Sequence, residues 1–548
     1  MKHTFFSFLL AACLLLNSSC SYGQRNDPAA QKINMAVAVI ENMYVDNVDK
    51  NKLANDALTA LLKGLDPHSA YMTPEEVKEM NEPLQGNFDG IGIQFNLMTD
   101  TIYVVQVIEG GPSQKVGLLA GDRIIYIDDT LMVGKEIKNT DVQKKLRGQK
   151  GTTVNVKVKR GKNPNLLAFK IVRDKIPLYS LDASYMLNKE IGYIKLNRFA
   201  ATTYDEFKTA LADLQKQGMR DLVLDLQDNG GGYLETAIQI ANEFLQRGNL
   251  IVYTEGTHQR REDAKADMRG SFETGKVVVL INESTASSSE IVAGALQDWD
   301  RAIIVGRRSF GKGLVQRPIP FPDGSMIKLT TARYYTPTGR NIQKPYENGD
   351  MESYNKDMIT RYNRGEMVSA DSIHFPDSLK YNTLVNKRIV YGGGGIMPDY
   401  FVPIDTARYT DMHRSVVASG ALNKYVMNLI EKNRKQYQNT TFSDFKRNFK
   451  VTDAMVNDVV DVLKKEDFEM IVMDTKNAHK SSNLTPEDLR QLEISKPLIK
   501  LQIKALMARD LWNTNEYFQI YNDDNESLKK ALDLLNNPKE YAKLLGEK

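Results

Sequence analysis

The stretch VVVLINESTASSSEI, residues 277–291, predicts a strand, a turn of small residues and the first turn of a helix. Its first five residues are apolar, as is typical of a parallel strand buried on both faces. Three other nearly continuous apolar runs have the same character: Ile191–Leu196, Leu222–Leu226 and Ala302–Val305. Helical segments separate these runs, and this alternation predicts βαβ units. We therefore expect an α/β core over residues 176–405.

Short β runs precede this core over residues 85–175. Within them, GPSQKVGLLAGDRIIYID (residues 111–128) resembles the PDZ domain, which adds a peptide as a strand to a sheet edge and holds its terminal carboxylate with backbone N–H groups. Glycines would let the backbone approach that anion closely. We therefore expect protein or peptide substrates to be bound by their C-terminus. The resemblance places the carboxylate loop at Gly90, Ile91, Gly92 and Ile93.

Helical segments flank these two regions. Apolar residues recur at helical spacing over residues 24–84, where Thr73 followed by Pro74 is a natural helix start. Residues 406–548 are helical and charged, and no chemistry can be read from them. The sequence thus predicts a multidomain α/β protein with an inserted β-rich domain, a helical N-terminal segment and a helical C-terminal extension.

Residues 1–23 have the layout of a secretory signal peptide, with Lys2 before an apolar core over residues 5–16. That core is shorter than the ~20 residues of a membrane span. Cleavage after Gly23 would release an exported, periplasmic protein that has no cysteine, which excludes disulfide scaffolds, thiol proteases and Cys-ligated zinc. Cleavage before Cys20 would instead leave a lipoprotein anchored through that thiol.

The charge balance narrows the class of function. The 548 residues include 72 Lys and Arg and 69 Asp and Glu, a net charge of +3, whereas a dedicated nucleic-acid binder usually has a strong basic excess. Hydrophobic residues make up 42% of the chain, which predicts a globular protein rather than a disordered one. We expect no nucleic-acid partner.

The serines at residues 287–289 have two interpretations. A serine at the N-terminal, positive end of a helix lies where negative charge is stabilised, as a nucleophile requires. Ser287 followed by Glu290 also fits a capping box, in which the serine only satisfies backbone donors. The segment alone leaves both interpretations open.

A second segment, GRRSFGKG at residues 306–313, nearly matches a phosphate-binding loop. It lacks the hydroxyl that would hold magnesium, and two prolines soon after it prevent the helix that must follow, so a nucleotide site is disfavoured. Lys312 can instead act as a base if burial favours its neutral form. If the following residues are extended, Lys312, Leu314 and Gln316 share one face, and Gln316 could accept from the amine.

Residues 284–316, STASSSEIVAGALQDWDRAIIVGRRSFGKGLVQ, closely resemble the carboxyl-terminal processing proteases, also called tail-specific proteases. The motifs DPHSAYMTPEE, DLQDNGGGYL, YYTPTGRNIQ and MPDYFVP extend the resemblance over residues 33–403. The family consists of Ser–Lys endopeptidases with an inserted PDZ domain and a core similar to crotonase and the Clp protease. The resemblance implies no metal or cofactor, and it implies that PDZ movement can gate access to the dyad.

The resemblance assigns a role to each matching residue. Ser287 is the nucleophile, Lys312 the general base and Gln316 the residue that positions the base, while Asp298 matches a structural position. The oxyanion donors are the backbone N–H groups of Ser288 and of Gly231 or Gly232. Two departures matter. The chain has QDNGGG where many members have RNNPGG, which weakens the oxyanion assignment, and the neighbouring Ser288 and Ser289 leave the register of the nucleophile to be tested.

The sequence therefore predicts an exported serine endopeptidase that captures a protein C-terminus and cleaves a peptide bond through an acyl-enzyme. Two other functions compete. A catalytically inactive PDZ adaptor would bind chain ends without using Ser287 or Lys312, and a crotonase-like acyl-transfer enzyme would share the core. The retained serine and lysine argue against the first, and the PDZ insertion argues against the second. The physiological substrate, the cleavage-site preference and the oligomeric state cannot be read from the sequence, although an oligomer is compatible with it.

Overall fold

The computed structural model describes residues 27–98, 101–108, 110–134, 137–161, 163–267, 269–437, 439–465 and 484–547. The predicted signal peptide and the candidate anchor Cys20 lie outside these residues. Among the helices of the described ranges, none combines the length and the apolar character that crossing a bilayer requires.

A six-stranded sheet forms the core. Its order is β10 (Leu181–Met186), β11 (Ile191–Leu196), β12 (Asp221–Asp225), β15 (Val277–Ile281), β16 (Ile303–Gly306) and β21 (Tyr400–Phe401). The strands from β11 to β21 are parallel, and β10 is antiparallel to β11. Three helices lie between the parallel strands β11, β12, β15 and β16 along the chain. They are α7 (Thr203–Lys216), which follows β11, α8 (Leu234–Asn242), which follows β12, and α9 (Ser288–Asp298), which follows β15. The predicted βαβ core is thereby confirmed.

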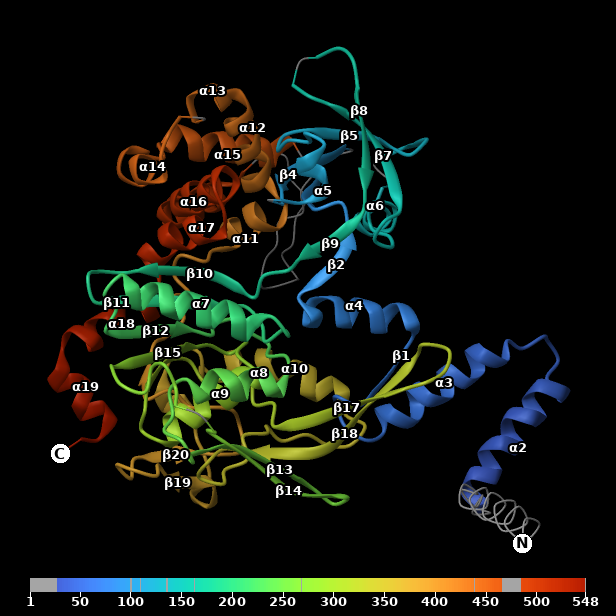
Figure 1. Ribbon diagram of the computed structural model, residues 1–548, viewed down its shortest axis with the longest axis vertical. Coiled ribbons are helices and arrows are strands. Elements are labelled where there is room, and N and C mark those ends of the chain that lie inside the picture. The colour runs from blue at the N-terminus through green and yellow to red at the C-terminus, as the bar shows by residue number, and fades with distance from the viewer. Residues whose placement is uncertain are drawn as a thin grey trace, which may run out of the picture.

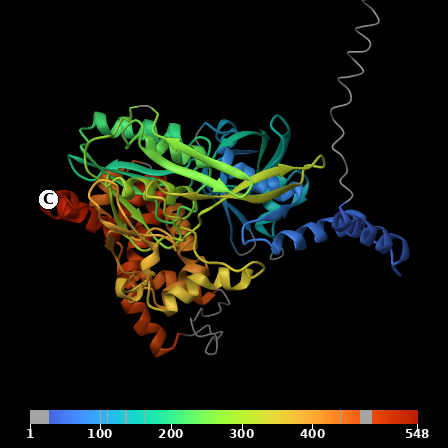
Figure 2. The ribbon, with the colours of Figure 1, turned by 90° about the horizontal axis from the view of Figure 1, so that it is seen from below.

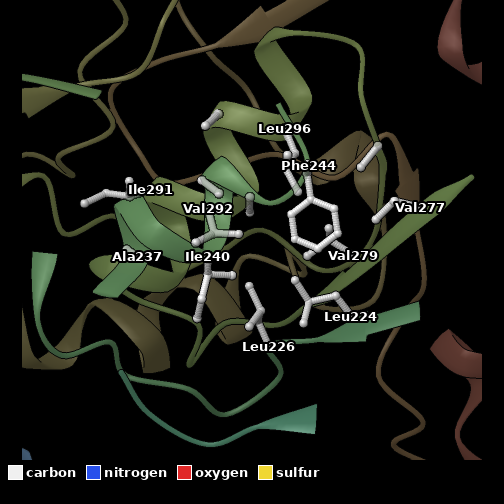
Figure 3. Packing of buried hydrophobic residues seen from close by; sticks show 14 of the residues in the cluster. Leu224, Leu226, Ala237, Ile240, Phe244, Val277, Val279, Ile291, Val292 and Leu296 are labelled. Carbon is white, nitrogen blue, oxygen red and sulfur yellow. The ribbon is translucent and has the colours of Figure 1, made fainter. Parts of the chain in front are cut away.

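Helices cover both faces of this sheet. On one face, Ile240 of α8, Phe244 just after that helix and Ile291 of α9 share one apolar core with Leu224 and Val279 of the strands (Figure 3). On the other face lie the last two helices of the chain, α18 (Glu526–Asn536) and α19 (Pro538–Leu545), whose apolar side chains share a core with the strands (Figure 1). The predicted boundary at residue 405 therefore separates the sheet from two of the helices that bury it.

The β-rich insertion is a second body, joined to the core by two paired strands, β2 (Asn87–Gly90) and β9 (Asp174–Pro177). Its sheet contains β3 (Ile93–Met98), β4 (Thr101–Val107), β5 (Arg123–Ile127), β6 (Thr130–Leu131), β7 (Thr153–Lys159) and β8 (Leu167–Val172). Two helices accompany the sheet: α5 (Pro112–Lys115) and α6 (Asn139–Leu146).

A third sheet lies beside the core. One of its strands comes from residues 24–84, so the prediction that this whole segment is helical is wrong in part. The sheet contains β1 (Ala70–Met72), β13 (Leu250–Gly256), β14 (Gln259–Lys265), β17 (Leu314–Pro320) and β18 (Met326–Tyr335). The short strand β1 pairs with β18 and so interrupts the helices α2 (Pro28–Met43), α3 (Lys50–Lys63) and α4 (Pro74–Gln85). Figure 2 shows α2 and α3, in blue, extending away from the rest of the molecule.

The remaining helices pack around α16 (Pro486–Leu511) in a core of their own. They are α11 (Asp411–Ala418), α12 (Ala421–Lys432), α13 (Arg434–Tyr437), α14 (Phe442–Asn448), α15 (Asp453–Lys465) and α17 (Thr514–Tyr521). This group lies beside the β-rich insertion (Figure 1), and the Arg434 guanidinium donates to the Ala120 carbonyl at 2.5 Å. Between β18 and β21 lie α10 (Met351–Asn363), β19 (Lys380–Asn382) and β20 (Ile389–Tyr391).

Candidate active site

Ser287 occupies the turn between β15 and α9, where it is the N-cap of the helix. Its backbone has φ 56° and ψ −116°, a conformation that residues other than glycine rarely adopt and that is typical of functional turns. Glu290 accepts the Ser287 N–H at 2.8 Å in a capping box, and the Tyr334 hydroxyl donates to the Ser287 carbonyl at 3.2 Å. Ser287 is half-buried and belongs to a capping box, and its backbone also has the conformation of a functional turn, so the two interpretations of this serine do not exclude each other.

A cavity of about 810 Å³ opens at this turn. Ser287, Ser288, Lys312, Gln316 and Gly232 all line it, although they come from the α9 turn, from the segment around β17 and from the loop after β12. The structure thus brings five of the six residues that we predicted for the catalytic centre to one cavity. Apolar side chains form much of the remaining wall, among them Met80, Leu84, Leu234, Ile291 and Leu314.

The ammonium group of Lys312 is largely buried in this cavity. Burial is the main cause that lowers the pKa of Lys312 to about 8, and the nearby charge of Lys328 lowers it further. The carboxylates of Glu290 and Asp66 oppose this effect only in part. A neutral amine, which can accept a proton, is therefore accessible close to neutral pH.

Glu290 connects the serine turn to the lysine loop, a role that sequence reasoning missed. Its fully buried carboxylate accepts from the N–H groups of Ser287, Gly311 and Lys312 at 2.8, 2.7 and 2.9 Å. It also accepts from the Ser309 hydroxyl at 2.5 Å. Burial raises the pKa of Glu290 to about 7, although the four donors act in the opposite direction. One side chain thereby fixes both backbones that carry the candidate dyad.

Gln316 is held by a chain of polar side chains that ends in the N-terminal segment. Its amide nitrogen donates to Thr330 Oγ1 at 3.3 Å, and the Thr330 hydroxyl donates to Asp66 at 3.0 Å. This leaves the Gln316 oxygen available to accept. Lys312, Leu314 and Gln316, which we expected to share one face, all line the cavity, although β17 begins only at Leu314. The register shift beside Gln316 places the extra residue, Thr331, on β18.

The loop after β12 lies against the serine turn and can do so only because it contains glycines. A Cβ atom on Gly231, which has φ 99°, would lie 2.8 Å from Ser287 Cβ, and one on Gly232 would lie 2.1 Å from the Phe199 carbonyl oxygen. The Gly231 N–H donates to Asn229 Oδ1 at 2.9 Å and is therefore occupied. Among the described residues, the N–H groups of Gly232 and Ser288 have no acceptor, which narrows the candidate oxyanion donors to these two.

The hydroxyls next to Ser287 hold this loop in place. Ser288 Oγ donates to the Gly232 carbonyl at 2.9 Å, and Ser289 Oγ donates to the Asn229 carbonyl at 2.9 Å. Asp298 lies at the far end of α9, where it pairs with the fully buried Arg340 at 2.7 Å. These three side chains are engaged in contacts that stabilise the fold.

A second cavity, of about 340 Å³, lies between β3 and α6 in the β-rich insertion. Ile91, Gly92 and Ile93 line it together with Leu146 and Arg147. Gly90, which we also placed in the carboxylate loop, is the last residue of β2, where it pairs with Asp174. Gly92 has φ 75°, a value that a glycine adopts without strain.

Two further residues near the cavity at Ser287 escaped the sequence analysis. His68, in the turn before β1, is mostly buried, and burial together with the charge of Lys312 lowers its pKa to about 4. Lys328 of β18 lines the cavity itself. The DPHS turn at residues 66–69 was a recognisable motif, but nothing in the sequence indicated that it packs against β18, 260 residues away. Across the described ranges, no group of three or more His, Cys, Asp or Glu is arranged to hold a metal ion.

Four family descriptions match parts of the chain. Residues 190–352 match "Peptidase family S41", and residues 90–171 match "PDZ domain". Residues 16–76 match "Activating protease CtpB N-terminal domain". Residues 412–513 match a family of unknown function, which covers most of the helices around α16.

Curated relatives agree with these matches. The chain is 40% identical over 312 residues to a carboxy-terminal-processing protease of Bartonella bacilliformis, covering 56% of this chain and 70% of the relative. It is 34% identical over 338 residues to the carboxy-terminal processing protease CtpA of Bacillus subtilis, covering 60% and 71%. Among solved structures, the photosystem II D1 C-terminal processing protease is 29% identical over 57% of this chain and 89% of that chain, with a TM-score of 0.33.

Proposed function

The chain belongs to the carboxy-terminal processing protease family of serine-type peptidases, and from this premise we propose that it is a Ser–Lys endopeptidase that cleaves protein substrates captured by their C-terminus. Ser287 is the nucleophile, Lys312 is the general base, and Gln316 positions the lysine amine. The single observation that carries this assignment is the shared cavity, which all three residues line and in which the amine is largely buried.

In the proposed reaction, the neutral amine of Lys312 takes the proton of the Ser287 hydroxyl as the oxygen attacks the peptide carbonyl. The resulting oxyanion accepts from the N–H groups of Gly232 and Ser288, which face no other acceptor in the described chain. The lysine ammonium then gives its proton to the leaving amine. The acyl-enzyme is hydrolysed by water, which Lys312 activates in the same way.

Substrate capture is assigned to the PDZ domain. The groove between β3 and α6 is open at a sheet edge, which suits a peptide that adds as a further strand. Its glycine-containing end, at Gly92, suits the terminal carboxylate. The bound chain would then reach the catalytic cavity with an internal segment, so cleavage releases a C-terminal piece.

We also propose that the protein acts outside the cytoplasm, in the cell envelope. This rests on the signal-peptide layout of residues 1–23. Whether the mature protein starts after Gly23 or carries a lipid on Cys20 is decided by mass spectrometry of the native N-terminus. A mass that matches Gln24 favours the released form, and a diacylglyceryl cysteine at residue 20 favours the anchored one.

The test is cleavage of an unfolded protein by the wild type and by matched serine variants. Ser287→Ala and Lys312→Ala should each abolish cleavage, whereas Ser288→Ala and Ser289→Ala should keep most of it because their hydroxyls only hold the glycine loop. If loss occurs at Ser288→Ala and not at Ser287→Ala, the nucleophile lies one residue further on. If the wild type binds chain ends but cleaves no better than Ser287→Ala, the protein is a PDZ adaptor.

A further inference from the structure

Lys328 is a cation in the catalytic cavity that the reaction described above does not use. It lies on β18 and lines the same wall as Lys312 and Gln316. Its ammonium group is partly buried, and burial lowers its pKa. Across the described residues it forms neither an ion pair nor a hydrogen bond, whereas most partly buried cations of a protein are paired.

The nearby carboxylate of Asp66 does not bind Lys328. Asp66 contributes a favourable charge to Lys328, but within the described residues no hydrogen bond or ion pair joins the two side chains. Asp66 Oδ1 accepts from the N–H groups of His68 and Ser69 and from the Thr330 hydroxyl, and Oδ2 accepts from the Ser69 hydroxyl. These donors hold the carboxylate in place, which leaves the Lys328 ammonium to bind a group that enters the cavity.

The register of the hairpin places Lys328 relative to the reacting groups. Gln316 pairs with Thr330 across β17 and β18, and Lys328 follows two residues along, opposite Pro318. Residues two apart lie on the same face of a strand and are separated by about 7 Å. An extended substrate has the same repeat, so a substrate group at Lys328 would lie about two residues from the one beside Gln316.

Resting on the proposed function, we propose that Lys328 is a specificity-determining residue that binds a substrate carboxylate about two residues from the cleaved bond. Two sources supply this chemistry in a peptide: the side chain of Asp or Glu, and the free C-terminus of a short chain. Lys328 is itself partly buried, and apolar side chains such as Leu314 and Pro318 line the cavity with it, which strengthens such an ion pair because less water competes for either charge.

The test uses quenched fluorescent peptides built around a bond that mass spectrometry has shown to be cleaved in an unfolded protein. One series places Asp or Asn at each of the four positions on either side of the bond. A second series ends two or three residues after the bond, with a free carboxylate or an amide. The enzymes are the wild type, Lys328→Met, Lys328→Gln and the control Arg317→Met, which removes an exposed charge from the opposite face of the same hairpin.

We expect the wild type and Arg317→Met to prefer Asp over Asn at one position, or carboxylate over amide, by about tenfold in kcat/KM. Both Lys328 variants should lose that preference while still cleaving the neutral peptide. Any effect of Lys328 on Lys312 changes the cleavage rates of the charged and the neutral peptide equally. The ratio of the two kcat/KM values therefore reports recognition of the carboxylate alone. If the Lys328 variants lose the preference for Asp over Asn in the first series, the ligand is a side chain. If they lose the preference for carboxylate over amide in the second series, the ligand is a chain end.

Two results would overturn the inference: a wild type that shows neither preference, or a preference of equal size in the wild type and in both Lys328 variants. A carboxylate effect that belongs to the PDZ groove gives the second result. Failure of the proposed function looks different, because then no peptide is cleaved, or Ser287→Ala cleaves as fast as the wild type.

Discussion

Replacing Lys312, the proposed general base, by methionine should make the protein more stable while it destroys activity. The pKa of Lys312 is lowered from 10.5 to about 8, mainly by burial. Each tenfold change in an acid constant corresponds to about 1.4 kcal/mol, so the charged ammonium destabilises the folded state by about 3 kcal/mol at pH 7. Methionine has a similar length and carries no charge, so Lys312→Met should recover most of this free energy.

The pH dependence of this gain has a definite sign. Between pH 8 and 10.5 the unfolded wild type binds more protons at this lysine than the folded protein does, so wild-type stability rises with pH in that window. Below pH 8 the destabilisation is fully present. The advantage of Lys312→Met should therefore fall from about 3 kcal/mol at pH 7 to about 1 kcal/mol at pH 10.

Urea unfolding followed by tryptophan fluorescence measures this difference. The chain has two tryptophans, and in a Trp512→Phe background Trp299 reports on the core that contains α9. Lys189→Met, at an exposed turn, is the matched control and should change stability by less than about 0.5 kcal/mol. Two results would refute the claim that the buried ammonium destabilises the folded protein. One is a Lys312→Met protein that is no more stable than the wild type at pH 7, and the other is a gain in the free energy of unfolding that is the same at pH 7 and pH 10.

Two other substitutions test the surroundings of the dyad. Gly232→Ala should abolish cleavage and lower the free energy of unfolding by about 2 to 4 kcal/mol, because the new Cβ would lie 2.1 Å from the Phe199 carbonyl oxygen. The control Gly230→Ala should change neither cleavage nor stability, because its Cβ would meet no atom within 4 Å. Thr330→Val should lower kcat about tenfold with KM unchanged, because Gln316 loses its anchor, and Thr330→Ser should restore the rate; equal kcat for all three proteins would exclude a positioning role.

The core could be predicted from the sequence because its signals are local. Continuous apolar runs marked β11, β12, β15 and β16, and the first three of these runs were each followed by a helix. The PDZ domain could also be predicted, because its signature is a single contiguous segment, residues 111–128. The candidate dyad came from two short segments that are 25 residues apart and whose resemblance to a known family assigned the roles.

What escaped prediction depends on contacts between distant segments. Glu290 fits a capping box, and that local explanation gave no sign that its carboxylate also binds the backbone of Gly311 and Lys312. Asp66 reaches Thr330 only because β1 pairs with β18, which is more than 250 residues away in the chain. A strand of three residues is too short for its sequence to indicate which strand it pairs with. The bulge at Thr331 changes which side chains of β18 share a face, and hydrophobic periodicity carries no signal for it.

The central claim is that a neutral Lys312 amine activates Ser287, and the pH dependence of acyl-enzyme formation in single turnovers tests it most directly. The account predicts a rate that rises about tenfold per pH unit below a midpoint near 8 and then levels off, with no burst in Lys312→Met. His68, the histidine that the charge of Lys312 affects, has a pKa near 4 and cannot produce this profile. A rate that does not change between pH 6 and 10, or that levels off near pH 5, would contradict lysine as the base.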